Sequence, residues 1–247
     1  MTPYYDDGQI TLYHGDCREV LPSLPRDSID LIVTDPPYGV NWQSNHRTSK
    51  LGRIEGDGQG ADDLIQAALA ASLRLLRSHR HLYVFGRPNL SDLPIGTTAE
   101  LVWDKAMLGM GDLSLPWGPS WEPITFGVYV SRPSGRAAGD GRLAARLRRG
   151  SIVRVPRANA GQLEDRHSPH ATPKPVVLLR QLIESSSLLG ETVLDPFAGR
   201  GSTLLTAQAE GRQAIGVEID ERHCEKAAAG LAALAARSRR DLLGLNG

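Results

Sequence analysis

A carboxylate, two prolines and an aromatic ring follow one another in the stretch Asp35-Pro36-Pro37-Tyr38-Gly39. The preceding residues, Ile29 to Thr34, are mostly apolar and β-branched, which predicts a buried strand. Proline has no backbone N–H and a fixed φ, so neither proline continues the strand and each favours extended geometry in the residue before it. The stretch therefore predicts a stiff acidic loop at the carboxyl end of a strand, where open α/β sheets hold their ligands. The plainer interpretation is a strand ended by proline, with a surface aspartate and a packing tyrosine.

A second group of residues with chemical potential lies near the other end of the chain, from Val193 to Thr203. It predicts a strand, a tight glycine loop and a helix that begins at Ser202 or Thr203. Small residues allow the backbone to approach a ligand closely, and the N–H groups of the helix face that ligand. The next predicted strand, Gln213 to Glu218, ends in an acid about 20 residues after this loop, as ribose recognition requires. Capping of the following helix is the alternative for Glu218, although Asp220 can supply that cap.

The two groups together resemble the motifs of the amino-methyltransferases, which methylate exocyclic amines of DNA bases with S-adenosylmethionine. Asp-Pro-Pro-Tyr resembles their catalytic motif, and Asp-Pro-Phe-x-Gly-x-Gly resembles their cofactor loop. Arg200 and Ser202 depart from the small residue and the threonine common at those places. The resemblance implies a catalytic role for four residues: Asp35, Pro36, Pro37 and Tyr38.

What these residues can do agrees with the resemblance. An exocyclic amine is a poor nucleophile because its lone pair is conjugated into the ring. The carboxylate of Asp35 and the carbonyl of Pro36 would accept hydrogen bonds from its N–H groups and stabilise the positive charge that develops as the methyl group arrives. Tyr38 would stack on the target base, which must leave the duplex to be reached.

The resemblance also implies a set of cofactor contacts. Asp16, after the predicted strand Ile10 to His14, resembles the position that accepts from the adenine amine of the cofactor, with the N–H of Cys17 on a ring nitrogen; an ordinary turn is the alternative. Thr172 or Lys174 resembles the element that holds the carboxylate of the cofactor, at the N-terminus of a helix expected from about 175 to 189. The complete implied set is Asp16, Cys17, Thr172, Lys174, Asp195, Phe197, Gly199, Gly201, Ser202, Thr203 and Glu218.

The segment from Ser131 to Arg157 holds eight arginines against one acid, Asp140. Arginine suits bidentate contacts with phosphate and guanine, so the segment is the local footprint expected of a DNA-binding insertion. A solvated basic loop is the alternative. The polar stretch from Val40 to Gly60 is interpreted as a lid over the site or as ordinary disorder. The residues predicted to contact DNA are Arg132, Arg136, Arg142, Arg146, Arg148 and Arg149.

The predicted architecture is a single α/β domain: a doubly wound, mostly parallel sheet of the Rossmann-like methyltransferase type, circularly permuted, with a short basic recognition insertion. The acidic loop precedes the glycine loop by about 160 residues, whereas a dehydrogenase-type Rossmann domain opens with its glycine loop. We expect a catalytic half at 1–130, a recognition region at 131–168 and a cofactor half at 169–247. The strand that ends at Asp195 is expected in the centre, between those that end at Thr34 and Glu218, with the strand that ends at His14 beyond Glu218. Amphipathic helices are predicted from Asp62 to Arg77, with Asp62 or Asp63 as the cap, and from Glu221 to Arg237; Trp103 and Trp121 are expected in the core.

Composition sets the remaining bounds. The net charge is zero, so any basic surface must be local. The two cysteines, Cys17 and Cys224, are far apart and have no metal-type spacing, which fits a reducing cytoplasm. Neither a signal peptide nor an apolar run long enough for a membrane helix is expected.

The function expected from the resemblance is methylation of adenine N6 in a base flipped out of double-stranded DNA. Methylation of cytosine N4 is the closest alternative, since the acceptor is the same kind of amine; aspartate as the first residue of the motif favours adenine. A catalytically inactive DNA-binding subunit is the third alternative, against which the intact motifs weigh. Members of this group are often dimers, and a homodimer would compensate for a small recognition region.

Overall fold

The structure is a computed structural model of the chain, and it describes residues 1–37, 60–109, 113–130, 149–156 and 174–242. Within these ranges the strands form a nine-stranded sheet in the order β1-β2-β9-β8-β3-β4-β6-β5-β7. The strands are β1 (Tyr5–Asp6), β2 (Ile10–His14), β3 (Ile29–Thr34), β4 (Leu76–Phe85), β5 (Ile95–Asp104), β6 (Trp121–Tyr129), β7 (Ile152–Arg154), β8 (Thr192–Asp195) and β9 (Gln213–Glu218). The helices are α1 (Cys17–Val20), α2 (Ala61–Leu73), α4 (Val176–Ser186), α5 (Ser202–Ala209) and α6 (Glu221–Leu242), with a short 3-10 helix, η1, at Leu21–Ser23.

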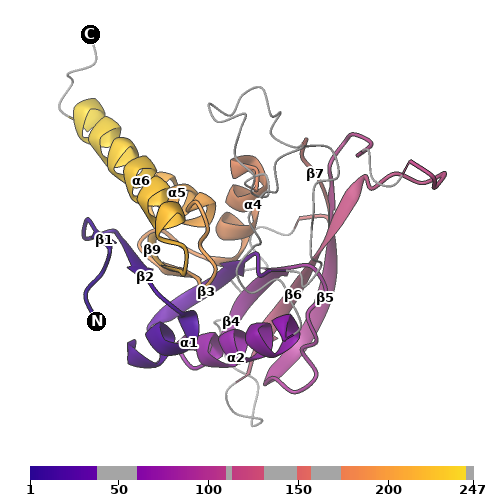
Figure 1. Ribbon diagram of the computed structural model, residues 1–247, viewed down its shortest axis with the longest axis horizontal. Helices are drawn as coiled ribbons and strands as arrows, with labels where there is room; N and C mark the ends of the chain where they lie inside the picture. The colour runs from indigo at the N-terminus through magenta and orange to yellow at the C-terminus, as the bar shows by residue number, and fades with distance from the viewer. Residues whose placement is uncertain (38–59, 110–112, 131–148, 157–173, 243–247) are drawn as a thin grey trace.

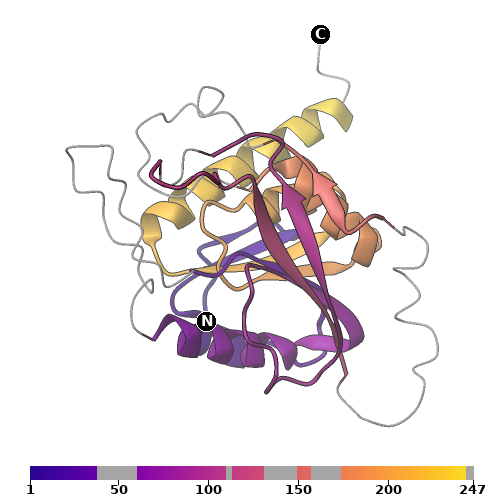
Figure 2. The same cartoon turned by 90° about the vertical axis from the view of Figure 1, so that its right-hand side faces the viewer.

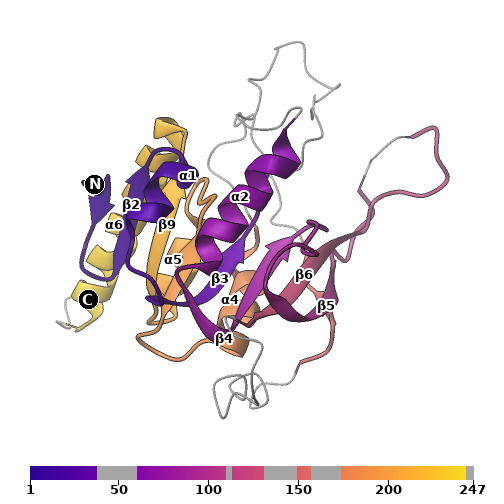
Figure 3. The same ribbon diagram turned by 90° about the horizontal axis from the view of Figure 1, so that it is seen from below.

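Helices cover both faces of the sheet (Figures 1 and 2). Helices α4, α5 and α6 pack on one face, and α1 and α2 pack on the other, where the view from below shows α2 across β3 and β4 (Figure 3). Strand β3 explains why both layers are needed. Leu31 and Val33 face the first layer and Ile32 faces the second, and all of β3 is buried. A strand covered on both faces has a continuous apolar run, which is the pattern seen in the sequence.

The central strand order predicted from the sequence is confirmed. Strand β8 lies between β3 and β9, and β2 lies beyond β9. All of these pairings are parallel. The carboxyl ends of the four strands therefore lie at one edge of the sheet, and Asp35, Asp195, Glu218 and Asp16 stand at or just beyond them.

Strands β5 and β6 extend the sheet beyond β4. Strand β6 is antiparallel to both β4 and β5, so β5 runs parallel to β4 and its last residue, Asp104, reaches the same edge as Asp35. Residues 149–156, the described part of the expected recognition region, contribute β7, which pairs in parallel with β5. In this stretch the chain continues the main sheet; the division into a catalytic half, a recognition region and a cofactor half remains a prediction.

Two expectations about α2 were wrong in detail. Helix α2 ends at Leu73 because β4 begins at Leu76, which pairs with Ile29. The N-cap of α2 is Gly60, with no side-chain cap; Asp62 and Asp63 lie in the first turn, where the helix dipole favours carboxylates.

Helices α4 and α6 also differ in length from the expectation. Helix α4 ends at Ser186, before the predicted Leu189, because Ser187 is extended. Helix α6 continues to Leu242, past the predicted Arg237. Apolar periodicity predicts the buried face of a helix more accurately than it predicts the residue at which the helix ends.

A buried hydrogen bond joins the ends of the two central strands. The hydroxyl of Thr34 donates to Oδ1 of Asp195 at 2.8 Å, and the N–H of Phe197 donates to the same oxygen at 3.1 Å. Burial raises the pKa of Asp195 to about 6, against hydrogen bonds from Thr34, Thr203 and Phe197 that lower it. The folded protein thus binds a proton at Asp195 more tightly than the unfolded chain does.

This shift predicts how stability depends on pH. A raised acid pKa contributes stability that is complete below the unfolded value of 3.8 and is lost as pH rises through about 6. The variant Asp195→Asn keeps an acceptor oxygen for Thr34 and Phe197 but does not titrate. Its free energy of unfolding, measured in urea from pH 4 to 7.5, should increase relative to that of the wild type as the pH rises, by at most about 3 kcal/mol. Parallel curves for the two proteins would contradict the shift.

Candidate active site

The carboxylate of Asp35 lies at the rim of the sheet, directly after β3, and bonds a lysine from far along the chain. Its Oδ2 is 2.8 Å from Nζ of Lys174, which stands just before α4. The Asp35 side chain is about one-third exposed, whereas that of Lys174 is 13 % exposed. Pro36 and Pro37 follow outside any helix or strand. The loop thus presents a partly accessible carboxylate supported by a buried cation.

The Lys174 ammonium continues into a chain of alternating charges. Its Nζ is also 2.8 Å from Oε1 of Glu122 in β6, and Oε2 of Glu122 is 3.1 Å from Nζ of Lys105, which follows β5. Two acids and two bases therefore alternate in one charged cluster, which consists of Asp35, Lys174, Glu122 and Lys105. The aromatic rings of Phe85 and Trp103 line the cluster: Lys174 Nζ lies 4.7 Å from the Phe85 ring centroid, and Lys105 Nζ lies 5.1 Å from that of Trp103.

The surroundings favour the ionised forms of the inner pair. Burial alone would lower the pKa of Lys174, but the carboxylates of Asp35 and Glu122 outweigh it and raise that pKa above its usual value. Burial likewise opposes ionisation of Glu122, yet the two lysines bring its pKa below the usual range. A charge taken out of water needs a partner, and here each inner charge has two.

The glycine loop lies at the neighbouring strand ends. Gly199 and Gly201 have φ values of +52° and +81°, in the left-handed region that favours glycine, and a Cβ on Gly201 would come within 2.9 Å of the Cβ of Ala227. The N–H of Gly199 donates to Oε2 of Glu218 at 2.7 Å, and the N–H of Asp220 donates to Oε1 at 2.9 Å. Each carboxylate oxygen has two lone pairs, so these bonds leave acceptor capacity for two vicinal hydroxyls. The residues present therefore fit a ribose.

Asp16 lies beside Glu218, because β2 pairs with β9 and the N–H of Gly15 donates to the carbonyl of Glu218 at 2.9 Å. Its side chain caps α1 by accepting from the N–H of Arg18 at 2.8 Å. The Arg18 guanidinium, bonded to the same carboxylate, lowers the pKa of Asp16. The ordinary capping role is thus present, and contact with adenine stays a prediction. Cys17 is buried in the core, so only its backbone belongs to that prediction.

Burial separates the predicted cofactor residues into two groups. Asp195 and Thr203 are only 3 % and 5 % exposed, and Asp195 is bonded to Thr34 and to the loop backbone. They support the glycine loop from inside the fold. Phe197, Gly199 and Ser202 are partly exposed, and Gly201 is buried against α6. Direct contact of any of these residues with the cofactor remains a prediction.

Several predicted site residues lie outside the described residues. They are Tyr38, Thr172, Arg132, Arg136, Arg142, Arg146 and Arg148, together with residues 40–59 of the expected lid. Of the arginines predicted to contact DNA, Arg149 is described: it donates to Glu184 at 2.7 Å and to Ser185 at 3.0 Å, both on α4. Its guanidinium is thus partly neutralised by the protein's own acid.

Sequence reasoning did not assign Lys105 and Glu122 to the site. Both lie beside tryptophans, in Trp103-Asp104-Lys105 and Trp121-Glu122-Pro123, and this grouping of aromatic and charged residues was the available signal. Trp103 is buried as expected and donates to the carbonyl of Val155 at 2.7 Å. Trp121 is 44 % exposed, so its placement in the core was wrong; it lies at the surface, with Arg87 over its ring at 5.3 Å.

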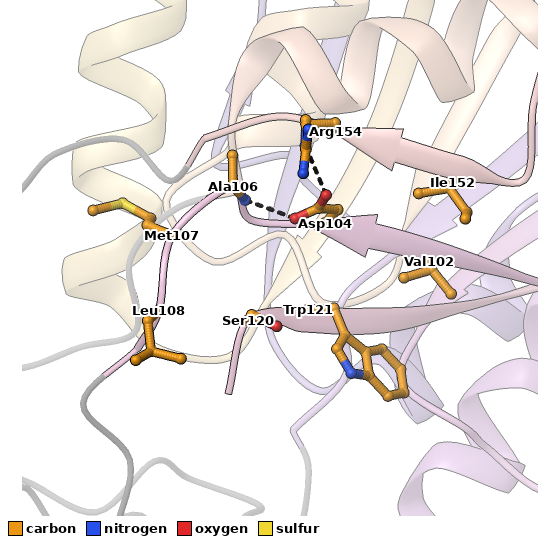
Figure 4. Close-up of a pocket in the computed structure, with 9 residues that line it drawn as sticks. All are labelled: Val102, Asp104, Ala106, Met107, Leu108, Ser120, Trp121, Ile152 and Arg154. Carbon is orange, nitrogen blue, oxygen red and sulfur yellow. Dashed lines mark hydrogen bonds and ion pairs between the residues drawn. The ribbon is translucent and has the colours of Figure 1, made fainter. Parts of the chain in front are cut away.

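Trp121 borders a hollow of about 510 Å³ formed along β5, β6 and β7 (Figure 4). An ion pair lines it: Nε of Arg154 in β7 is 2.8 Å from Oδ2 of Asp104 in the adjacent strand β5. Met107 and Leu108, at its other side, are exposed. The hollow contains no residue of the predicted catalytic or cofactor sets. In the described part of the chain, no helix is both long and apolar enough to cross a membrane.

The sequence is similar to known proteins. Residues 96–229 match the model of the DNA methylase family of N6 and N4 methyltransferases. The chain is 28 % identical over 244 residues to the DNA adenine methyltransferase YhdJ of Escherichia coli K12, a match that covers 86 % of this chain and 79 % of YhdJ.

Solved structures give the same result at the level of the fold. TTHA0409 of Thermus thermophilus, solved in complex with S-adenosyl-L-methionine, superposes with a TM-score of 0.61 at 25 % identity, over 90 % of this chain and 95 % of that one. PvuII DNA methyltransferase, described as cytosine-N4-specific, superposes with a TM-score of 0.68 at 16 % identity, over 98 % and 95 % of the two chains.

The fold and these matches define an S-adenosylmethionine-dependent amino-methyltransferase with the Rossmann-like methyltransferase fold. The family model covers more than half of the sequence. The chain belongs to the DNA methylase family of N6 and N4 methyltransferases.

The geometry around Glu218 predicts the effect of its substitution. Glu218→Gln keeps one acceptor oxygen, but its amide nitrogen cannot accept from the second of the two backbone N–H groups, and the charge and acceptor capacity that a ribose would use are lost. We expect the dissociation constant of S-adenosylmethionine, measured by calorimetry, to rise by about tenfold or more. Glu210→Gln, which alters an acid paired with Arg180 away from this edge, serves as the matched control. Equal affinities of Glu218→Gln and wild type would remove Glu218 from the ribose site.

Proposed function

We propose that this protein transfers a methyl group from S-adenosylmethionine to the exocyclic N6 amine of adenine in DNA, with the base flipped out of the duplex. The observation that carries the proposal is the meeting of two motifs at adjacent strand ends. Asp35 follows β3, the glycine loop follows β8, and the bond from Thr34 to Asp195 joins the two strand ends. A donor bound against the glycine loop would lie beside the acceptor loop.

The chemistry follows from the groups at this edge. When bound, S-adenosylmethionine supplies a methyl carbon attached to a positively charged sulfur. Asp35 and the carbonyl of Pro36 would accept hydrogen bonds from the N–H groups of the base and favour the pyramidal form of the nitrogen. The nitrogen lone pair would form the new N–C bond as the C–S bond breaks and its electron pair stays with sulfur, and the surplus proton of the amine would pass by way of the Asp35 carboxylate to water. No group with an elevated pKa is required, because the amine becomes acidic as the methyl group arrives.

Two observations favour adenine over cytosine. The first residue of the motif is aspartate rather than serine, and the related E. coli protein YhdJ is named a DNA adenine methyltransferase. Cytosine N4 is the alternative, because its amine has the same conjugation and the same two protons. In this proposal Tyr38 stacks on the flipped base, and the arginines of the recognition region at 131–168 contact the phosphates.

The acceptor role of Asp35 predicts a separation of binding from chemistry. Asp35→Ala should reduce methyl transfer to DNA by about 100- to 1,000-fold, because it removes a preorganised acceptor at the developing charge. Its dissociation constant for S-adenosylmethionine should stay within a few-fold of the wild type. Transfer is measured with a labelled methyl donor and binding by calorimetry. Wild-type turnover by Asp35→Ala would refute the catalytic assignment.

The identity of the product decides between the two bases. DNA lacking methylated bases is incubated with the enzyme and donor, digested to nucleosides and separated by chromatography. We expect N6-methyladenine. Recovery of N4-methylcytosine alone would replace adenine by cytosine in the proposal, and label in neither nucleoside would refute it.

A further inference from the structure

Lys174 occupies a place that its predicted contact with the donor does not explain. Its ammonium lies between two carboxylates, at 2.8 Å from Oδ2 of Asp35 and 2.8 Å from Oε1 of Glu122. It is buried over the face of Phe85. A lysine whose main role is to hold the carboxylate of a ligand would not need two protein carboxylates of its own at this distance.

The prolines of the loop leave one problem unsolved. Pro36 and Pro37 stiffen the backbone that follows Asp35, but they do not fix the two side-chain torsions that aim its carboxylate. The bond from Lys174 to Oδ2 restricts those torsions. Glu122 holds the ammonium from its other side, and Lys105 holds Glu122 at 3.1 Å. Each charged side chain in this series thus restricts the side-chain torsions of the next one, and the series ends at the carboxylate of Asp35.

Charge indicates that the effect of Lys174 is positional. The amine becomes positive during methyl transfer, so a cation next to Asp35 opposes that charge by simple electrostatics. The carboxylate of Glu122, 2.8 Å from Nζ of Lys174, reduces this opposition, and the four groups together carry no net charge. A neutralised cation can orient the carboxylate without strongly repelling the reacting centre.

We propose that Lys174 is a positioning residue for Asp35, and that Glu122, supported by Lys105, sets the place of Lys174. The inference rests on the proposed amine methylation and deepens it. It assigns Lys174, from the second half of the sequence, to the acceptor loop in the first half, and it gives a role to two charged residues outside the acidic and glycine motifs.

The test separates positioning from donor binding. Lys174→Met removes the ammonium and keeps an unbranched chain against Phe85. We expect kcat for DNA methylation to fall by about 100-fold, the effect of a small misplacement at a reacting centre. The dissociation constant of S-adenosylmethionine should change by less than about threefold. Arg180→Met, which removes a cation of α4 paired with Glu210 at the surface, should match the wild type in both.

Glu122→Gln is a second variant, in which the residues Lys174 and Asp35 are both retained. Its kcat should fall less than that of Lys174→Met, by about tenfold, because Lys174 loses one of its two supports. The double variant should be no slower than Lys174→Met alone, since Glu122 acts through Lys174. Additive losses in kcat would indicate two independent structural defects and overturn the inference.

The remaining outcomes distinguish the inference from the proposed function. A large rise in the donor dissociation constant of Lys174→Met, with kcat preserved, would assign Lys174 to the donor instead. A wild-type protein that methylates no base would refute the proposed function, and the crystal structure of Lys174→Met then decides the inference alone. A rotated Asp35 carboxylate in that structure supports positioning, and an unchanged rotamer overturns it.

Discussion

The bond from the Thr34 hydroxyl to the Asp195 carboxylate is the constraint on which the site depends. It joins residues 161 positions apart, at the ends of β3 and β8, and both partners are buried. Backbone pairing between these strands covers only Leu31 with Val193 and Ile32 with Leu194. The side-chain bond extends that short register to the strand ends, directly before Asp35. The bond therefore fixes the position of the strand end before Asp35 relative to the start of the glycine loop.

The acidic side chains at this edge of the sheet have different partners. Glu218 accepts from the loop backbone, Asp16 caps α1, and Asp35 bonds Lys174 while remaining partly exposed. Arg18 neutralises Asp16, whereas Asp195 accepts from a hydroxyl and a backbone N–H, and burial raises its pKa. A positively charged donor would thus meet a polar rim on which Asp16 and Asp35 are paired with cations, whereas Glu218 and Asp195 accept from backbone N–H and hydroxyl groups.

The central strands could be predicted from the sequence because apolar runs, prolines and glycines act locally, whereas the strand order came from the doubly wound topology that the order of the motifs implies. Such signals place Asp35, Glu218 and the glycine loop at strand ends, and parallel pairing brings the ends together. They do not report where a side chain points. Asp195 stands at a strand end as expected, yet it turns inward to Thr34. The meeting of Lys105, Glu122 and Lys174 was not predicted, because strand periodicity distinguishes two faces of a sheet and says nothing of which distant charges share one.

The charged cluster around Asp35 is built from segments that are far apart in the sequence. The acceptor comes from the first strands of the sheet, whereas the cation that bonds it comes from the start of α4, and Glu122 comes from β6 between them. None of these segments can build the charged cluster alone. An isolated Asp35 loop would keep its stiff backbone but lose the partner of its carboxylate, and an isolated Lys174 would be a buried charge without compensation, which is costly. The acceptor is therefore complete only when β3, β6 and the segment just before α4 have come together in the folded domain.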